Sequence, residues 1–363
     1  MNVSMPIDLN PLLLTLFFAQ VALNLLVINI WNNQELKKFH GVYQAEQKIH
    51  DGFVPRFGGF VMLVVFVMMY FFELFSDDWQ LLISHLLMSL TPLILVTFLE
   101  DVYNNILPLA RLFFIFLSAI LALSLGDFQL PFIDLPLAAP FLVEHQWVWI
   151  TFLTIAVAAM VNAFNLVDGA NGLLLSTFLS IFLCLRMMGG VVDDMDWQHL
   201  TNLLVLLCII QLLFNFPQAR MFCGDLGAYV FGFITAMLTI IFFGQYPEFL
   251  TWQAILILFY PAWELLFTIC RRFISNKSPF EADRNHLHQL IFDVLRSHNF
   301  NNLWSNAMST IILAPLWASA LIWLSIHGAE LSFLQTFLGL GLQIILYLFY
   351  YFGFYKLAHN ESH

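Results

Sequence analysis

The chain has 363 residues, of which 61% are hydrophobic and only 10% are charged, and its formal net charge is −11. A soluble domain normally has about 25% charged residues, so the composition excludes an ordinary soluble protein and favours one solvated by a lipid bilayer. The negative charge argues against a nucleic-acid partner, and the four cysteines form no C-x-x-C pair typical of a zinc site.

Eleven stretches are candidate transmembrane helices, because a helix needs about 20 mainly apolar residues to cross the hydrocarbon core. In chain order they are residues 11–30, 58–75, 80–98, 109–125, 147–163, 172–188, 199–215, 226–243, 251–270, 306–326 and 333–353. No internal repeat or low-complexity linker divides the chain. The sequence therefore predicts an all-α polytopic membrane protein, with one membrane-embedded domain over residues 1–363.

The basic residues predict the orientation of this domain, because Lys and Arg concentrate in cytoplasmic loops. The loops after odd-numbered spans and the C-terminal tail contain all but one of them: Lys37, Lys38, Lys48, Arg56, Arg111, Arg220, Arg271, Arg272, Lys277, Arg284, Arg296 and Lys356. Only Arg186 lies toward the other side, where the loops carry Asp and Glu. We therefore expect the N-terminus outside and the C-terminus in the cytoplasm.

Five polar clusters fall in the predicted cytoplasmic loops, over residues 31–57, 99–109, 162–172, 216–226 and 271–305. Hard oxygen ligands of the kind that Mg²⁺ prefers are supplied by Glu100, Asp101, Asn162, Asn165, Asp168 and Asp225. Donors that suit a pyrophosphate are supplied by Arg284, His286 and His288. The clusters together indicate a metal-dependent site that handles phosphates.

Most of these clusters, taken alone, also have a structural explanation. The Glu100-Asp101 pair could be a solvated helix end, and His286 and His288 could be surface histidines. Glu264 lies within an apolar run, where a carboxylate indicates function by default, but it could also snorkel or pair with Arg271 or Arg272. The segment from Asn162 to Gly172 is the hardest to explain structurally, because its polar groups must otherwise be solvated at the membrane edge.

In order and spacing, the clusters resemble motifs of the polyprenyl-phosphate N-acetylhexosamine-1-phosphate transferase family, which includes the phospho-MurNAc-pentapeptide translocase. The resemblance covers about residues 50 to 290. The family's Asp-Asp pair looks like Glu100-Asp101, and its Asn-x-x-Asn-x-x-Asp-Gly-x-Asp/Asn-Gly segment is matched from Asn162 to Gly172. Its Gly-Asp-x-Gly and Asp-Arg-x-His-x-His-His segments are matched by Gly224 to Gly227 and by Asp283 to Gln289. The segment from His50 to Gly59 and the position of Glu264 also match.

The resemblance implies roles for the matching residues. Asp225 would be the principal ligand of Mg²⁺, with Mn²⁺ as the alternative ion, and Asn165 the second ligand. Asp101, supported by Glu100, would deprotonate or position the acceptor phosphate, and Asp168 would be the covalent nucleophile if the reaction had two steps. His286 and His288 would clamp the donor. The other substrate-binding residues would be Arg56, Asn162, Asn171, Gly172, Asp283 and Arg284.

The implied reaction is the Mg²⁺-dependent transfer of an N-acetylhexosamine 1-phosphate from a UDP-sugar to polyprenyl (undecaprenyl) phosphate, with release of UMP. We expect it at the cytoplasmic face of the bacterial inner membrane, at the start of a lipid-linked surface polysaccharide such as O-antigen, in a chain that could form a homodimer. Gln289, in place of the family's last histidine, favours a simple sugar over a muramyl peptide.

Two other functions stay open. A multi-span transporter would suit Glu264, although transporters bind substrate near the bilayer midplane and these polar clusters collect at one edge. A catalytically inactive homologue would suit the departures at Glu100 and Gln289.

Overall fold

The computed structural model describes residues 9–32, 54–72, 75–103, 105–126, 128–132, 134, 139–276 and 284–360. These residues form helices and no strand, which confirms the predicted all-α class. The helices are α1 (Leu9–Trp31), α2 (Gly58–Phe71), α3 (Asp77–Tyr103), α4 (Pro108–Leu125), α5 (Ala139–Glu144), α6 (Gln146–Val167), α7 (Leu173–Val191), α8 (Met195–Asn215), α9 (Gly224–Gln245), α10 (Trp252–Ile257), α11 (Phe259–Ile274), α12 (Leu287–Ser297), α13 (Asn302–Ile312), α14 (Ala314–Trp317), α15 (Ser319–His327) and α16 (Phe333–Asn360).

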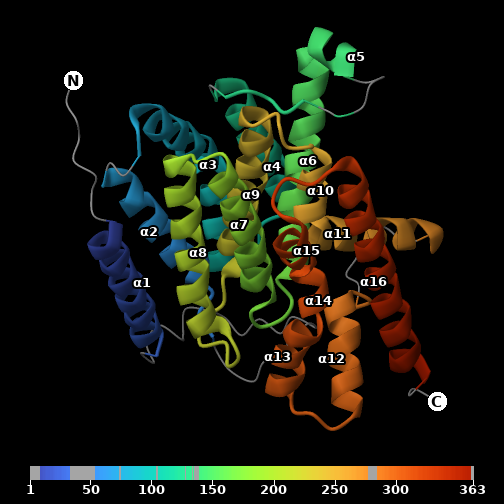
Figure 1. Cartoon of the computed structure of the whole chain (residues 1–363). Helices are drawn as coiled ribbons and strands as arrows, with labels where there is room; N and C mark the ends of the chain where they lie inside the picture. The colour runs from blue at the N-terminus through green and yellow to red at the C-terminus, as the bar shows by residue number, and fades with distance from the viewer. Residues whose placement is uncertain are drawn as a thin grey trace.

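Each of the eleven predicted spans corresponds to a helical segment. Within the described ranges, nine segments are long and apolar enough to cross a membrane, and α13 to α15 form one of them. The second span is the 14-residue α2, and the ninth is divided at Leu258 into α10 and α11. Pro261 lacks the N–H that would bond to Ile257, which accounts for the break, and α11 leaves the bundle sideways (Figure 1).

Helix α9 lies at the centre of the bundle, in contact with α2, α3, α6 and α7. All but two of its 22 residues are buried. A Cβ atom on Gly59 of α2 would lie 2.1 Å from Cα of Gly227, so the two backbones touch at this crossing. Small residues permit such close approach between membrane helices. The crossing fixes the segment before α2 against the N-terminus of α9.

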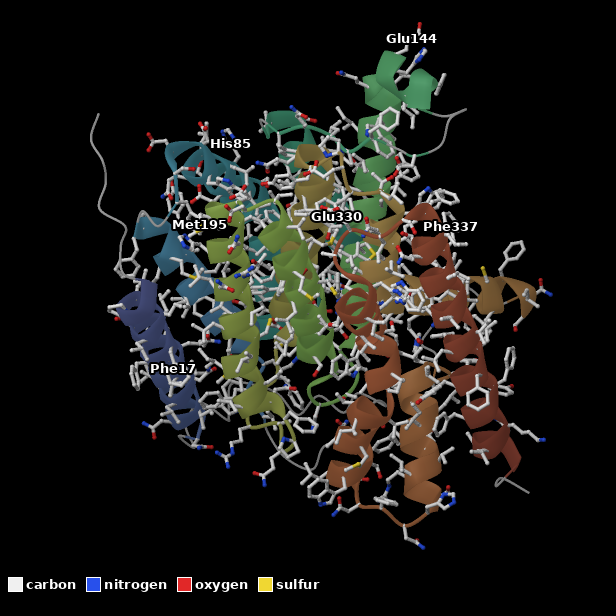
Figure 2. The ribbon with its side chains drawn as sticks, viewed as in Figure 1. Phe17, His85, Glu144, Met195, Glu330 and Phe337 are labelled. Atoms are coloured by element: carbon white, nitrogen blue, oxygen red, sulfur yellow. The ribbon has the colours of Figure 1, made fainter. Side chains whose placement is uncertain are left out.

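The two ends of the bundle differ in their connections. The C-terminal ends of α1 and α16 point toward the end that carries the α12–α13 hairpin (Figure 1). Glu144, Glu330 and Met195, which follows two aspartates, lie toward the opposite end (Figure 2). The acidic loops and the predicted cytoplasmic loops are thus separated, as the charge pattern requires. Which end faces the cytoplasm stays a prediction.

Candidate functional site

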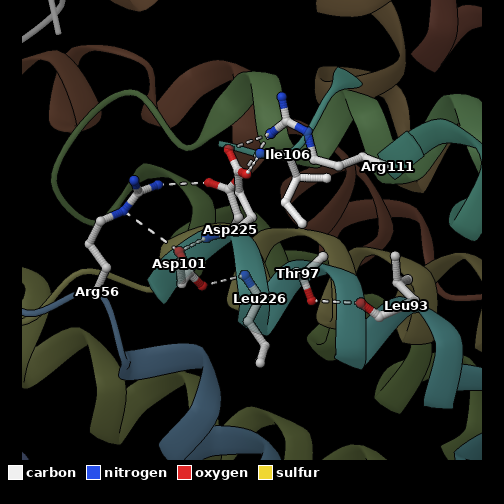
Figure 3. A network of polar contacts seen from close by, with 9 residues as sticks. Arg56, Leu93, Thr97, Asp101, Ile106, Arg111, Asp225 and Leu226 are labelled. Atoms are coloured by element: carbon white, nitrogen blue, oxygen red, sulfur yellow. Dashed lines mark hydrogen bonds and ion pairs between the residues drawn. The ribbon is translucent and has the colours of Figure 1, made fainter. Parts of the chain in front are cut away.

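Asp101, near the C-terminal end of α3, caps the N-terminus of α9 (Figure 3). Its Oδ1 accepts a hydrogen bond from the backbone N–H of Asp225, and its Oδ2 accepts one from Leu226, each at 2.8 Å. A helix leaves its first N–H groups without internal partners, and a carboxylate there satisfies them and complements the helix dipole. Gly224 precedes them with φ +75°, and a Cβ there would lie 2.2 Å from the carbonyl oxygen of Arg56.

The carboxylate of Asp225 lies between two arginines (Figure 3). Arg56 donates from Nη2 to Oδ1 at 2.7 Å, and Arg111 donates from Nη1 to Oδ2 at 2.8 Å. The guanidinium of Arg56 also lies 3.7 Å from Oδ1 of Asp101, and that of Arg111 lies 3.6 Å from Oε1 of Glu100. Two positive charges therefore compensate three closely placed carboxylates, which would otherwise repel one another.

Glu100 is buried, with 7% of its surface exposed, and its Oε2 accepts from the backbone N–H of Ile106 at 2.7 Å. It is therefore not a solvated helix end. The bond ties the end of α3 to the turn that leads into α4, the helix that carries Arg111. The glutamate thus helps to place one of the two arginines.

The Asn162–Gly172 segment begins in α6 and brings a further carboxylate to the cluster. Asp168 follows the last residue of α6, and its charge interacts with Arg56, Asp225 and Asp101. Burial is the main effect that raises the pKa of Asp168 to about 8; Asp225 and Asp101 act in the same direction, and Arg56 opposes them. Asn162 donates to the carbonyl of Ala158 one turn back in α6. Asn165 is partly exposed.

Asn171 is only 2% exposed and joins its loop to the protein around it. Its backbone N–H donates to Asn306 Oδ1, its carbonyl accepts from Thr310, and its side-chain NH₂ donates to the carbonyl of Pro217 at 2.8 Å. The neighbouring Gly172, at φ +80°, donates to Asn215 Oδ1. These contacts hold the loop in place, and the predicted contact of Asn171 and Gly172 with substrate stays a prediction.

Glu264 connects α11 to the histidine segment, which comprises His286 to His288 at the beginning of α12. It is 1% exposed, and its Oε1 lies 3.2 Å from Nδ1 of His286 and accepts from the N–H of Leu287 at 3.3 Å. Its Oε2 accepts from the hydroxyl of Tyr347 in α16 at 2.8 Å. The carboxylate therefore does not snorkel toward the interface. It anchors the beginning of α12 instead.

His286 and His288 are buried, at 8% and 3% exposure, so they are not surface histidines. Their rings are parallel, with centroids 5.9 Å apart. A Cβ on Gly169 would lie 1.9 Å from Nε2 of His288, which places this ring directly against the turn that contains Asp168. Arg284 is more exposed and lies 3.5 Å from Asp293 Oδ1. Asp283 falls outside the described residues.

The structure thus connects all five predicted clusters through named contacts. Sequence reasoning missed Arg111, Asn215, Asn306 and Tyr347 as members of the network. Arg111 left a usable signal, because it is a basic residue in the first turn of an apolar helix at the predicted cytoplasmic end. The two asparagines and the tyrosine are not marked by charge or motif.

The donor set is compatible with a divalent cation. Within the described ranges, no group of three or more His, Cys, Asp or Glu side chains is arranged to hold a metal. Mg²⁺ needs only one or two carboxylates, however, and takes its other ligands from water and phosphate oxygens. The Asp225 carboxylate, with the amide oxygen of Asn165 as the predicted second ligand, provides the hard oxygen chemistry that such an ion requires.

Comparisons with known proteins agree with the motifs. The family model described as glycosyl transferase family 4 matches residues 82–243, which begin within α3, end two residues before the end of α9 and include three of the five clusters. A probable undecaprenyl-phosphate N-acetylglucosaminyl 1-phosphate transferase of Bacillus subtilis is 28% identical over 296 residues, 78% of each chain.

Two further relatives match shorter regions. An undecaprenyl-phosphate alpha-N-acetylglucosaminyl 1-phosphate transferase of Thermotoga maritima is 30% identical over 38% of this chain and 42% of the relative. A phospho-N-acetylmuramoyl-pentapeptide-transferase of Dictyoglomus thermophilum is 27% identical over 63% of this chain and 74% of the relative.

Proposed function

We propose, because the chain belongs to glycosyl transferase family 4, that it transfers an N-acetylhexosamine 1-phosphate from a UDP-sugar to polyprenyl phosphate and releases UMP. The observation that carries the proposal is the meeting of Arg56, Asp101 and Asp225, which come from three separated motifs, at the N-terminus of the central helix. Phosphoryl transfer depends mainly on positioning and charge compensation, and this cluster offers both.

In the proposed reaction, an oxygen of the prenyl phosphate attacks the β-phosphorus of the UDP-sugar. The new P–O bond joins the sugar phosphate to the lipid, and the bond from the β-phosphorus to the bridging oxygen breaks, so that UMP leaves with that oxygen. Mg²⁺, with Mn²⁺ as the alternative, would be held by Asp225 and Asn165 and would compensate charge on the phosphate oxygens. Asp101 keeps α9 and Asp225 in place and faces Arg56.

Two routes remain for the acceptor side. In a one-step route, Asp101, supported by Glu100, positions or deprotonates the acceptor phosphate. In a two-step route, Asp168 forms a covalent intermediate. Incubation with labelled UMP and a UDP-sugar, without prenyl phosphate, separates the routes, because only a covalent intermediate allows UMP to exchange into the UDP-sugar.

The donor would be bound by residues from several of the clusters. Arg56, Arg284, Asn162, Asn171, Gly172 and Asp283 are the proposed substrate-binding residues, and His286 and His288 would donate to the pyrophosphate. Glu264 supports this arrangement as a positioning residue, because its buried carboxylate bonds to the first residues of the histidine segment.

The proposed location is the cytoplasmic face of a bacterial inner membrane, where the enzyme would initiate a lipid-linked surface polysaccharide such as O-antigen. The segregation of basic residues supports this orientation. A homodimer is compatible with the proposal and is not required by it, because the residues that carry it come from one chain.

The test is an assay of purified protein with Mg²⁺, undecaprenyl phosphate and a panel of radiolabelled UDP-sugars. We expect one UDP-N-acetylhexosamine to give a labelled lipid and an equal amount of UMP. A fully folded protein that gives neither product with any sugar would instead be an inactive homologue. Uptake of an intact solute into proteoliposomes without UMP release would indicate a transporter.

A further inference from the structure

Both oxygens of the Asp225 carboxylate are occupied by arginine. Oδ1 accepts from Arg56 and Oδ2 accepts from Arg111, at 2.7 and 2.8 Å. These are charge-assisted hydrogen bonds, which are stronger than neutral ones. A divalent cation needs direct access to a carboxylate oxygen, so binding at Asp225 requires at least one guanidinium to move away.

The arginines have features that suit a change of partner. The side chain of Arg56 is 44% exposed, and the described residues next to it, 54–57, are not helical. The side chain of Arg111 is 20% exposed, and its Nε–H is buried without an acceptor in the described part of the chain. A buried donor without a partner carries an energetic cost. An incoming anion would satisfy it.

Each arginine also has a second carboxylate within reach. Arg56 lies 3.7 Å from Asp101, and Arg111 lies 3.6 Å from Glu100. Neither arginine would therefore lose all charge compensation when it leaves Asp225. The phosphates of a nucleotide offer several anionic oxygens, to which guanidinium groups donate in a bidentate manner.

We propose that Arg56 and Arg111 block the carboxylate of Asp225 until a uridine nucleotide binds, and that the two guanidinium groups then bond to its phosphate instead. The nucleotide and a divalent cation therefore bind to this site cooperatively. This inference rests on the proposed function for the identity of the nucleotide. It assigns to Arg111 a role in the site that none of the five motifs indicated. By thermodynamic linkage, the nucleotide strengthens cation binding by the same factor as the cation strengthens nucleotide binding.

The experiment measures the affinity of the purified full chain for Mn²⁺ by electron paramagnetic resonance, with and without UMP. A protein-free titration of UMP with Mn²⁺ provides the correction for binding between the two. For the wild type we expect UMP to tighten Mn²⁺ binding by about 5- to 150-fold, the usual range for coupled sites. For Arg56→Gln and Arg111→Gln we expect tighter Mn²⁺ binding without UMP, and a smaller effect of UMP.

A matched control is Arg186→Gln, which removes an arginine that bonds to Asn202 within the α7–α8 pair, away from the cluster. It should retain the wild-type Mn²⁺ affinity and the wild-type effect of UMP. A gain in affinity is informative because a misfolded variant would lose binding. If Arg111→Gln and Arg56→Gln bind Mn²⁺ as weakly as the wild type or more weakly, the proposal that the two arginines block Asp225 is refuted.

The outcome also separates this inference from the proposed function. If the wild type forms the labelled lipid but UMP leaves its Mn²⁺ affinity unchanged, only the cooperative binding is refuted. If the wild type binds no Mn²⁺ with or without UMP, both the inference and the metal assignment in the proposed function fail.

Discussion

Oε1 of Glu264 lies 3.2 Å from Nδ1 of His286, although the two residues are 22 positions apart in the chain. The same carboxylate accepts from the N–H of Leu287 and from Tyr347. A buried carboxylate requires such partners, because burial without them is costly. The position of the histidine segment is therefore set by α11 and α16.

Glu264→Gln tests this positioning role, because it keeps the shape of the side chain and removes its negative charge. We expect kcat for sugar-phosphate transfer to fall about 10- to 100-fold, the size of loss known for residues that orient metal-bound histidines. Tyr347→Phe removes one of the three bonds and should have a smaller effect. Steady-state kinetics at several pH values provide the measurement, and an unchanged kcat and pH profile in Glu264→Gln would refute the role.

Gly169→Ala tests the contact between the Asp168 turn and the histidine segment. The added methyl group would lie 1.9 Å from Nε2 of His288, so the ring or the turn must move. Displacement of about 1 Å in an active site can reduce activity about 100-fold, and we expect a loss of this order. Gly341→Ala is the matched control, because its Cβ would meet nothing within 4 Å. Equal activity of both variants would show that the contact is dispensable.

His288 should make the folded state sensitive to acid. Burial, and then the charge of His286, lower the pKa of His288 from 6.5 to about 4, against the opposing effect of Glu264. Between these values the unfolded chain binds the extra proton and the folded chain does not. The corresponding free energy of unfolding is therefore fully present above pH 6.5 and is lost as the pH falls toward 4.

The size of this effect is about 3 kcal/mol at most, since one unit of pKa corresponds to about 1.4 kcal/mol. Thermal unfolding of the detergent-solubilised protein at pH 7.5 and pH 4.5 measures it. We expect His288→Gln to lose less stability on acidification than the wild type does. Identical losses in the two proteins would contradict the assignment.

The sequence predicted the helical segments well, because the hydrocarbon core imposes a length and composition that can be counted. It did not predict the division at Leu258. The ninth span contains no charged residue from 251 to 263, and a proline within a membrane helix is often tolerated. The structure, rather than the composition, shows that the chain changes direction where α11 begins (Figure 1).

The motifs predicted which residues gather at the site, but not how they bond. Asp101 was expected to act on the acceptor, and the structure shows that both of its oxygens cap α9. Capping depends on where the end of one helix meets the start of another, which spacing along the chain does not encode. Tyr347 lies 83 residues from Glu264, within an aromatic run that packing alone would explain.

We propose that the carboxylate of Asp225 serves the transfer reaction from the end of the bundle where the five clusters meet. The most direct measurement compares Asp225→Asn with Asp78→Asn, an exposed aspartate at the start of α3, remote from Asp101 at the end of that helix. Both are assayed with Mg²⁺, undecaprenyl phosphate and the preferred radiolabelled UDP-sugar. We predict that Asp225→Asn forms no labelled lipid, whereas Asp78→Asn retains wild-type activity. Undiminished transfer by a correctly folded Asp225→Asn variant would contradict this role of Asp225.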